Sequence, residues 1–278
     1  MVTMPVPAPL ARPALRALSI PPSLVYKRRN RTTEDSHLAD DPVRLEKLGY
    51  EAGGQAILSG VSLRSGARRI GVVGRNGSGK STLSRLVAGL LQPASGSVRI
   101  EGVDVYADRR AALRTVGILF QNPEHQIIFP TVGEEIAFGL RQLGASASQA
   151  QDQTRATLAR FDRAHWLDAP VSALSQGQKH LVCMMAVLAM QPRLLILDEP
   201  FAGLDIPTKR QLSRHLARAG ARLFHISHDP QDLADYDQIY WLEQGRIIAE
   251  GPPATLLPAF TAEMMRLGDQ DDLADIAL

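Results

Sequence analysis

The stretch Gly74-Arg75-Asn76-Gly77-Ser78-Gly79-Lys80-Ser81 decides the fold, because it fits the pattern G-x-x-x-x-G-K-[ST]. An apolar run at Ile70–Val73 precedes it and apolar residues at helical spacing follow it, so it joins a strand to a helix. The glycines let several N–H groups point into one cavity, which the positive end of the helix also faces. We therefore predict a site for the phosphates of a nucleoside triphosphate, formed by Gly74, Arg75, Asn76, Gly77, Ser78, Gly79, Lys80, Ser81 and Thr82.

Two adjacent acids, Asp198 and Glu199, supply a second part of the same site. They end the continuous apolar run Leu194–Leu197, which is typical of a central parallel strand. Ligands of such folds bind at the carboxyl ends of the strands. We expect Lys80 to reach the outer phosphates, and Ser81 and Asp198 to ligate Mg²⁺. Glu199 is then positioned for the attacking water, and the nearby phosphate loop argues against a merely solvated acidic pair.

Length and composition bound the class of protein. The 278 residues carry 31 Lys+Arg against 29 Asp+Glu, and 45% of them are hydrophobic, which is ordinary globular usage. The longest apolar run, Leu181–Met190, is well short of the roughly 20 residues that span a bilayer. The single cysteine, Cys183, excludes an internal disulfide and fits a reducing compartment. The chain is expected to be one large α/β domain or two small ones.

Strands that alternate with helices predict an α/β fold with a mostly parallel central sheet. The run Leu223–Ile226 is a further strand of this sheet. Gly53-Gly54 before Gln55–Leu63 predicts a turn in a small antiparallel sheet. Residues of about 131–190 are mainly helical in pattern, and the polar segment 144–153 reads as a connection between helices.

The two ends of the chain differ from its centre. Residues 1–33 hold six basic residues, many prolines and no acid. We expect residues 1–40 to be a disordered basic extension or to precede the true start, with a membrane-touching arm or a targeting segment as alternatives. Residues 41–255 form the predicted globular domain. Residues 256–278 are predicted to be an acidic tail that ends in a surface helix.

The pentapeptide Leu174-Ser175-Gln176-Gly177-Gln178 distinguishes this chain from other nucleotide-binding proteins. It stands upstream of the acidic strand, at the head of a helical pattern. Gln121, Ala202-Gly203-Leu204-Asp205 and His228 each follow one of the predicted strands or the acidic pair. In this order and spacing the chain resembles the nucleotide-binding domain of ABC-type ATPases over about residues 43–253. Gln176 stands where that family usually has a glycine.

This resemblance implies a P-loop NTPase with a small antiparallel β-subdomain and a helical signature subdomain. It also implies that ATP and Mg²⁺ are held between two such subunits. Gln176 would point away from the nucleotide while Gly177 keeps the close approach. Ordinary packing is the alternative for Tyr50, and His225 is expected in the core or at the surface. The resemblance implies that Ser175, Gly177 and Gln178 contact the γ-phosphate held by the second subunit and that Asp205 couples the two sites. It implies that Tyr50 stacks on adenine and that His228 contacts the γ-phosphate. Gln121 would sense Mg²⁺ and the attacking water.

Several classes do not fit this pattern. Exporters often carry their own membrane spans, translation factors carry two cassettes, and chromosome and repair proteins insert a long coiled coil before the signature. A P-loop kinase or GTPase lacks the pentapeptide, and we find no Asn-Lys-x-Asp motif. A lone cassette that couples to separate membrane subunits remains.

The segment Phe120–Gly139 is similar to the region after the glutamine loop in ATPases of energy-coupling factor transporters, which import vitamins and transition-metal ions. Ile127, Ile128 and Phe129 suit a surface for a partner's coupling helix, and core packing is the alternative. The pentapeptide and the run Phe201–Asp205 are most similar to the biotin-uptake members. Cobalt or nickel importers are the nearest alternative.

The sequence thus leads to the hypothesis of a subunit that hydrolyses ATP to power biotin uptake. The expected partners are a second ABC ATPase subunit of the same or a different chain, a transmembrane coupling protein and a substrate-capture membrane protein, with no nucleic acid. The chain would lie peripherally on the cytoplasmic face of the membrane. A soluble ABC-type ATPase of a cytosolic assembly system, such as an iron–sulfur scaffold, is the alternative from another class.

Overall fold

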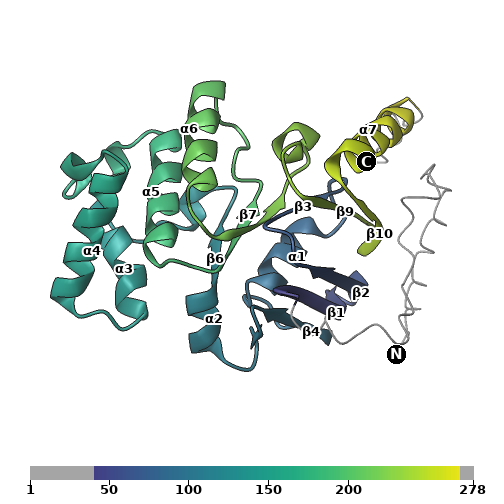
Figure 1. The fold of residues 1–278 in the computed structure, drawn as a ribbon, viewed down its shortest axis with the longest axis horizontal. Helices are drawn as coiled ribbons and strands as arrows, with labels where there is room; N and C mark the ends of the chain where they lie inside the picture. Colours follow the sequence, from purple (N-terminus) through teal and green to yellow (C-terminus); the bar gives the residue numbers. More distant parts are fainter. Residues whose placement is uncertain (1–40, 270–278) are drawn as a thin grey trace, which may run out of the picture.

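A parallel sheet forms the centre of the molecule (Figure 1). The structure is a computed structural model that describes residues 41–269. The strand order is β10-β9-β3-β8-β7-β6; only β10 runs antiparallel to its neighbour. The strands are β3 (Arg69–Val73), β6 (Val116–Leu119), β7 (Leu194–Asp198), β8 (Arg222–Ile226), β9 (Gln238–Glu243) and β10 (Arg246–Gly251).

A second, antiparallel sheet covers one face of the central sheet. Its strands, in the order β2-β1-β4-β5, are β1 (Val43–Ala52), β2 (Gln55–Ser65), β4 (Ser95–Ile100) and β5 (Val103–Asp104). Helix α1 (Lys80–Val87) lies between the sheets, and Leu83 and Leu86 are fully buried there. Successive side chains of a strand point to opposite faces of the sheet, so Leu194 and Ile196 of β7 face this core, whereas Leu195 faces the other side.

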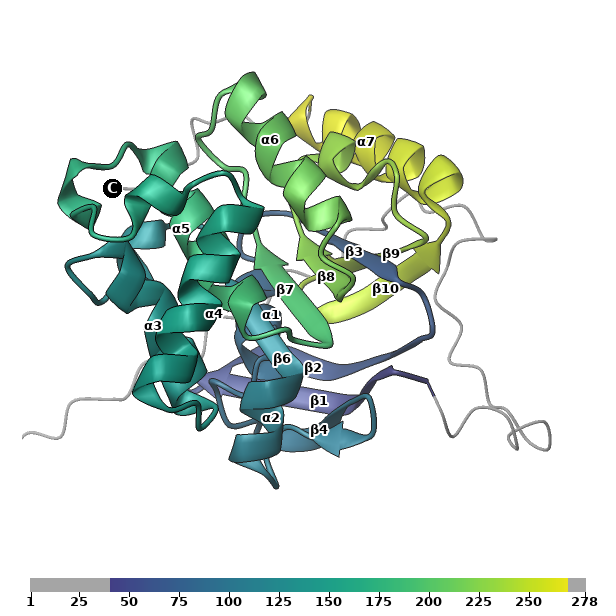
Figure 2. The same cartoon turned by 60° about the vertical axis from the view of Figure 1, so that its left-hand side comes forward.

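Helices cover the opposite face, so the molecule has three layers. In Figure 2 these layers run from α6 and α7 through the central strands to β1, β2 and β4. Helix α5 (Gln176–Ala189) and helix α6 (Ile206–Ala217) share a core with the outer face of β7. Helix α7 (Pro253–Gly268) packs on β9, where the rings of Trp241 and Phe260 meet edge to face with centroids 5.2 Å apart.

The remaining helices connect the layers and form a separate helical part. Helix α3 (Val132–Gln142) packs on α5 and on α4 (Ala147–Arg160). The predicted connection at 144–153 is wrong over most of its length, because Ser146 caps α4 in a capping box with Gln149. The other short elements are α2 (Arg109–Thr115) and the 3₁₀ turns Pro123–His125, Ala164–Trp166, Val171–Ala173 and Pro230–Leu233.

The predicted central sheet and antiparallel β-subdomain are confirmed. Part of the predicted tail belongs to the core, since Leu256, Leu257 and Phe260 on the inner side of α7 are buried. The predicted extension at 1–40 and the end of the tail after residue 269 lie outside the described residues. No helix within residues 41–269 is long and apolar enough to cross a membrane. Cys183 is buried in α5.

Candidate functional site

The loop between β3 and α1 has the backbone that phosphate binding needs. Gly77 and Gly79 adopt left-handed conformations, with φ of 78° and 101°. Gly79 stands at the N-cap of α1 and provides no side-chain cap, so the first N–H groups of the helix have no capping side chain as a partner. These groups and the helix dipole together favour an anion at this point.

The turn between β9 and β10 supports the loop from below. A Cβ atom on Gly74 would lie 2.2 Å from the carbonyl oxygen of Leu242, so only glycine fits there. The N–H group of Gly245 donates to the carbonyl of Ser78 at 3.0 Å. The buried Glu243 completes this turn, and burial raises the pKa of its carboxyl while the positive charge of Arg75 opposes the rise. This role of Glu243 was not predicted from the sequence.

Lys80 lies inside the curve of the loop. Its Nζ atom donates to the carbonyl oxygens of Gly74 and Arg75 at 2.8 and 2.9 Å, and the side chain is buried. Burial lowers the pKa of the ammonium, whereas the carboxylates of Glu199 and Asp198 raise it. A cation held among carbonyl groups beside two acids is suited to contact phosphate oxygens.

Asp198 meets α1 at the carboxyl end of β7, as predicted. Ser81 donates to Asp198 Oδ1 at 3.3 Å, and Ser84, one turn further along α1, donates to Oδ2 at 2.8 Å. Burial raises the pKa of Asp198, and both hydrogen bonds oppose that rise. Hydroxyl and carboxylate oxygens are ligands that Mg²⁺ prefers, so Ser81 and Asp198 fit the ion. Ser84 was missed, although its i+3 spacing from Ser81 was visible.

Glu199 and His228 come together from two neighbouring strands. His228 Nδ1 lies 2.9 Å from Glu199 Oε2, and the histidine side chain is 55% exposed whereas the carboxylate is 14% exposed. Glu199 has a left-handed backbone with φ of 50°, and its N–H group donates to Ile226 in β8 at 2.9 Å. The carboxylate is thereby fixed beside Asp198 at the edge of the sheet. This geometry suits a group that orients a water molecule.

His225, three residues before His228, is part of the core. It is fully buried and its Nδ1 lies 2.7 Å from the hydroxyl of Tyr236. Burial, assisted by the charge of Lys209, lowers the pKa of this imidazole to about 3. His225 therefore stays neutral and supports the strand that carries His228.

The pentapeptide occupies the start of α5. Ser175 is the N-cap, and a capping box joins it to Gln178: Gln178 N donates to Ser175 Oγ at 3.3 Å and Ser175 N donates to Gln178 Oε1 at 2.8 Å. A Cβ atom on Gly177 would lie 2.8 Å from Thr208 Cγ2 of α6. Packing against α6 therefore favours glycine at this position, a reason that does not follow from the local sequence.

Gln121, Asp205 and Tyr50 lie at separate places in the chain. Gln121 is exposed after β6, and its carbonyl oxygen lies 3.1 Å from Nε2 of the buried His180 in α5. Asp205 caps α6 by accepting from Thr208 N at 2.9 Å, and the hydrogen bonds from Thr208 lower its pKa. Tyr50 is half-buried against the core between the sheets. Their predicted nucleotide roles remain predictions.

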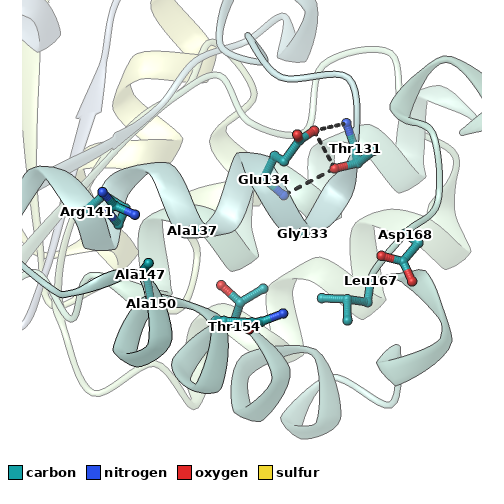
Figure 3. A pocket seen from close by; sticks show the side chains of 11 residues that line it. Thr131, Gly133, Glu134, Ala137, Arg141, Ala147, Ala150, Thr154, Leu167 and Asp168 are labelled. Atoms are coloured by element: carbon teal, nitrogen blue, oxygen red, sulfur yellow. Dashed lines mark hydrogen bonds between the residues drawn. The ribbon is translucent and has the colours of Figure 1, made fainter.

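The segment after Gln121 presents an apolar surface. Ile128 is 63% exposed and Phe138 is 37% exposed, and the ring centroids of Phe129 and Phe138 lie 5.1 Å apart. A surface cavity of about 360 Å³ opens nearby between α3 and α4 (Figure 3). Glu134, in a capping box with Thr131, lies on its wall. Exposed apolar side chains of this size suit contact with another protein.

Comparison with known proteins gives the family. Residues 59–202 match the protein family described as ABC transporter. The chain is 50% identical to the biotin transport ATP-binding protein BioM of Rhodobacter capsulatus, over 78% of this chain and 93% of that protein. It is 34% identical to the energy-coupling factor transporter ATP-binding protein EcfA of Methanothermobacter thermautotrophicus, over 81% of this chain and 74% of that protein.

A solved structure agrees with these relatives. The protein cbiO1 of Clostridium perfringens, part of the ABC transporter complex cbiONQ, superposes with a TM-score of 0.68 and 28% identity, over 83% of this chain and 95% of that one. The predicted fold class is therefore confirmed. The chain belongs to the ABC transporter family and is one of its ATP-binding, ATP-hydrolysing subunits.

Proposed function

We propose that this chain hydrolyses ATP to drive biotin uptake, as the ATPase subunit of an energy-coupling factor transporter. The observation that carries the proposal is the 50% identity to BioM across most of both chains. The similarity to EcfA supports the transporter type. The chain acts peripherally on the cytoplasmic face of the membrane, with a transmembrane coupling protein and a substrate-capture membrane protein as partners.

The phosphate loop binds ATP in this proposal. The N–H groups of residues 74–82 and the ammonium of Lys80 hold the phosphates, while Ser81 and Asp198 hold Mg²⁺. When bound, Mg²⁺ neutralises charge that develops on the phosphate oxygens. The hydrogen bond from Ser84 leaves Asp198 Oδ1 turned toward Ser81, which supports this assignment.

Glu199 orients the attacking water and accepts its proton, and His228 contacts the γ-phosphate. The 2.9 Å contact between these two side chains supports a shared task, because each limits the motion of the other. Gln121 completes the site by sensing Mg²⁺ and the water. Tyr50 stacks on the adenine ring from β1.

A second ATPase subunit, of the same or a different chain, closes the site. Ser175, Gly177 and Gln178 of one subunit face the γ-phosphate held by the other, and Asp205 couples the two sites. The start of α5 supports this arrangement, because the positive end of a helix stabilises negative charge. Loss of the γ-phosphate removes that attraction, and the two subunits separate.

The exposed residues after Gln121 receive the membrane partner. Ile128 and Phe138 are large, apolar and exposed, and they follow the loop that senses the nucleotide. A partner seated there would move when the loop moves, which is how hydrolysis would drive transport.

The test is biotin uptake by cells that express the complete transporter with this chain. Wild-type chain should support uptake of labelled biotin, and Lys80→Ala should abolish it by weakening nucleotide binding. Calorimetry on the purified chain should show the same loss of ATP affinity. Uptake of cobalt or nickel in place of biotin would reject the substrate, and purification without integral membrane proteins would favour a soluble assembly ATPase.

A further inference from the structure

Two loops at the carboxyl edge of the central sheet carry residues of the proposed site: residues 199–205, between β7 and α6, hold Glu199 and Asp205, and residues 227–237, between β8 and β9, hold His228. These loops belong to different parts of the chain, so their relative positions need a common support. The side chain of Lys209, in the first turn of α6, contacts residues of both loops. Its main-chain N–H group donates to the carbonyl of Asp205 at 2.9 Å, so Lys209 lies in the helical turn that Asp205 caps.

The ammonium group of Lys209 contacts the loop that follows His228. Lys209 Nζ forms an ion pair with Asp232 Oδ1, and it lies 3.7 Å from Asp229 Oδ2. The Asp232 side chain is only 7% exposed and that of Lys209 is 32% exposed. The pair is thus partly withdrawn from water, where a charge contact holds its geometry better than on an open surface.

Asp232 connects Lys209 to Ser227 and, through Ser227, to Asp229, the residues on either side of His228. Its Oδ2 atom accepts from Ser227 Oγ at 3.1 Å, and Ser227 Oγ accepts from the N–H group of Asp229 at 3.0 Å. Ser227 is buried, with its own N–H group donating to Val72 in β3 at 3.2 Å. The backbone at His228 is therefore fixed from both sides.

The same ammonium group lies over the loop that follows Glu199. Lys209 Nζ is 5.8 Å from the ring centroid of Phe201, within the range of a cation–π contact. The Phe201 ring meets the buried His225 edge on, with centroids 5.6 Å apart. Phe201 is two residues from Glu199, so this contact holds the far side of the acidic loop.

We propose that Lys209 is a positioning residue that fixes Glu199 and His228 relative to α6, the helix capped by Asp205. One cation links the loop after the acids, the loop after the histidine and the start of α6. A shift of the Asp205 end of the helix then moves the pair that orients the attacking water. The inference rests on the roles proposed for Glu199 and His228.

The test compares three variants of the chain in its purified transporter. Lys209→Met keeps most of the length of the side chain and removes its charge, and Lys209→Arg keeps the charge. Arg210→Met removes a cation from the next, exposed position of the same helix and serves as the matched control. For each variant kcat and KM of ATP hydrolysis, ATP affinity and melting temperature are measured.

Lys209→Met should lower kcat roughly ten- to hundredfold, since small displacements of reacting groups have effects of that size, with KM and ATP affinity within about twofold. Lys209→Arg should keep most of kcat, and Arg210→Met should match wild type. Asp232→Asn should reproduce the loss, and the double variant with Lys209→Met should be no slower than either single one.

Two results would overturn the inference. One is an unchanged kcat in Lys209→Met, and the other is a parallel fall in kcat, affinity and melting temperature that Lys209→Arg does not restore. Glu199→Gln is measured alongside. If Glu199→Gln is inactive while Lys209→Met is normal, only the positioning role fails, whereas an active Glu199→Gln rejects the proposed site itself.

Discussion

His180 Nε2 lies 3.1 Å from the main-chain carbonyl oxygen of Gln121, which joins helix α5 to the loop after β6. Lys179, the preceding residue of α5, forms an ion pair with Glu124 in the same loop. The helix that begins with the pentapeptide and the loop that precedes the exposed apolar surface are therefore held together by adjacent side chains. We therefore expect movement of either one to be transmitted to the other.

His180→Leu should reduce the coupling between hydrolysis and transport. The change removes the ring contacts to the carbonyl oxygens of Gln121 and Gln176. Because a lost hydrogen bond between α5 and the Gln121 loop amounts to about 1 kcal/mol, we expect roughly fivefold less biotin transported per ATP hydrolysed. Transport and hydrolysis are measured together in vesicles that contain the complete transporter. His165→Leu, at an exposed histidine of the helical part, is the control. Equal ratios in both variants would show that the contact carries no coupling.

Glu199→Gln should lower ATP turnover by about 10²–10⁴-fold while leaving ATP bound, because a positioned base contributes an effect of that size. The amide keeps the shape of the side chain and loses its proton-accepting charge. Turnover is measured by phosphate release and binding by calorimetry. Glu51→Gln, at an exposed position near the β1–β2 turn, should behave as wild type. Near-normal turnover in Glu199→Gln would remove its assigned role.

The buried His225 predicts an acid-sensitive fold. Its pKa is about 3 in the folded protein and ordinarily 6.5, so between these values only the unfolded chain binds the proton. The contribution of His225 to the free energy of unfolding is fully present above about pH 6.5, and it falls by up to a few kcal/mol as the pH drops toward 3. His225→Gln should flatten this slope in urea unfolding measured from pH 7 to pH 4. An unchanged slope would exclude His225 as the source.

Gly177→Ala should destabilise the protein by roughly 1–3 kcal/mol, since its Cβ would press on Thr208 Cγ2 at 2.8 Å. Thr208→Ser removes that methyl group and keeps the hydroxyl. The double variant should regain most of the lost stability in thermal unfolding. A double variant as unstable as Gly177→Ala would show that the glycine is needed for another reason.

The parts of the site that depend on short motifs and on the neighbouring strand could be predicted from the sequence. The phosphate loop and the acids Asp198 and Glu199 each stand directly after an apolar strand, so their common edge followed from the parallel sheet. The contacts of Lys209 and Thr208 could not be predicted in the same way. Each joins elements far apart in the chain, and its partner depends on how helices pack on the sheet.

The start of α4 was missed for a different reason. Its buried residues include Ala150 and Thr154, and small or polar side chains give a weak hydrophobic period. The capping signal of Ser146 and Gln149 was present in the sequence and was the better guide. A helix with a mostly polar surface is predicted more readily from its capping residues than from its hydrophobic period.

The burial of Cys183 makes the protein convenient for site-directed spectroscopy. Its Sγ lies 4.0 Å from the carbonyl oxygen of Pro123, and burial raises the pKa of the thiol to about 12. The thiolate that reacts with maleimides is therefore scarce at neutral pH. A reporter cysteine placed at the exposed Ile128 can be labelled with a fluorophore while the native thiol is left in place.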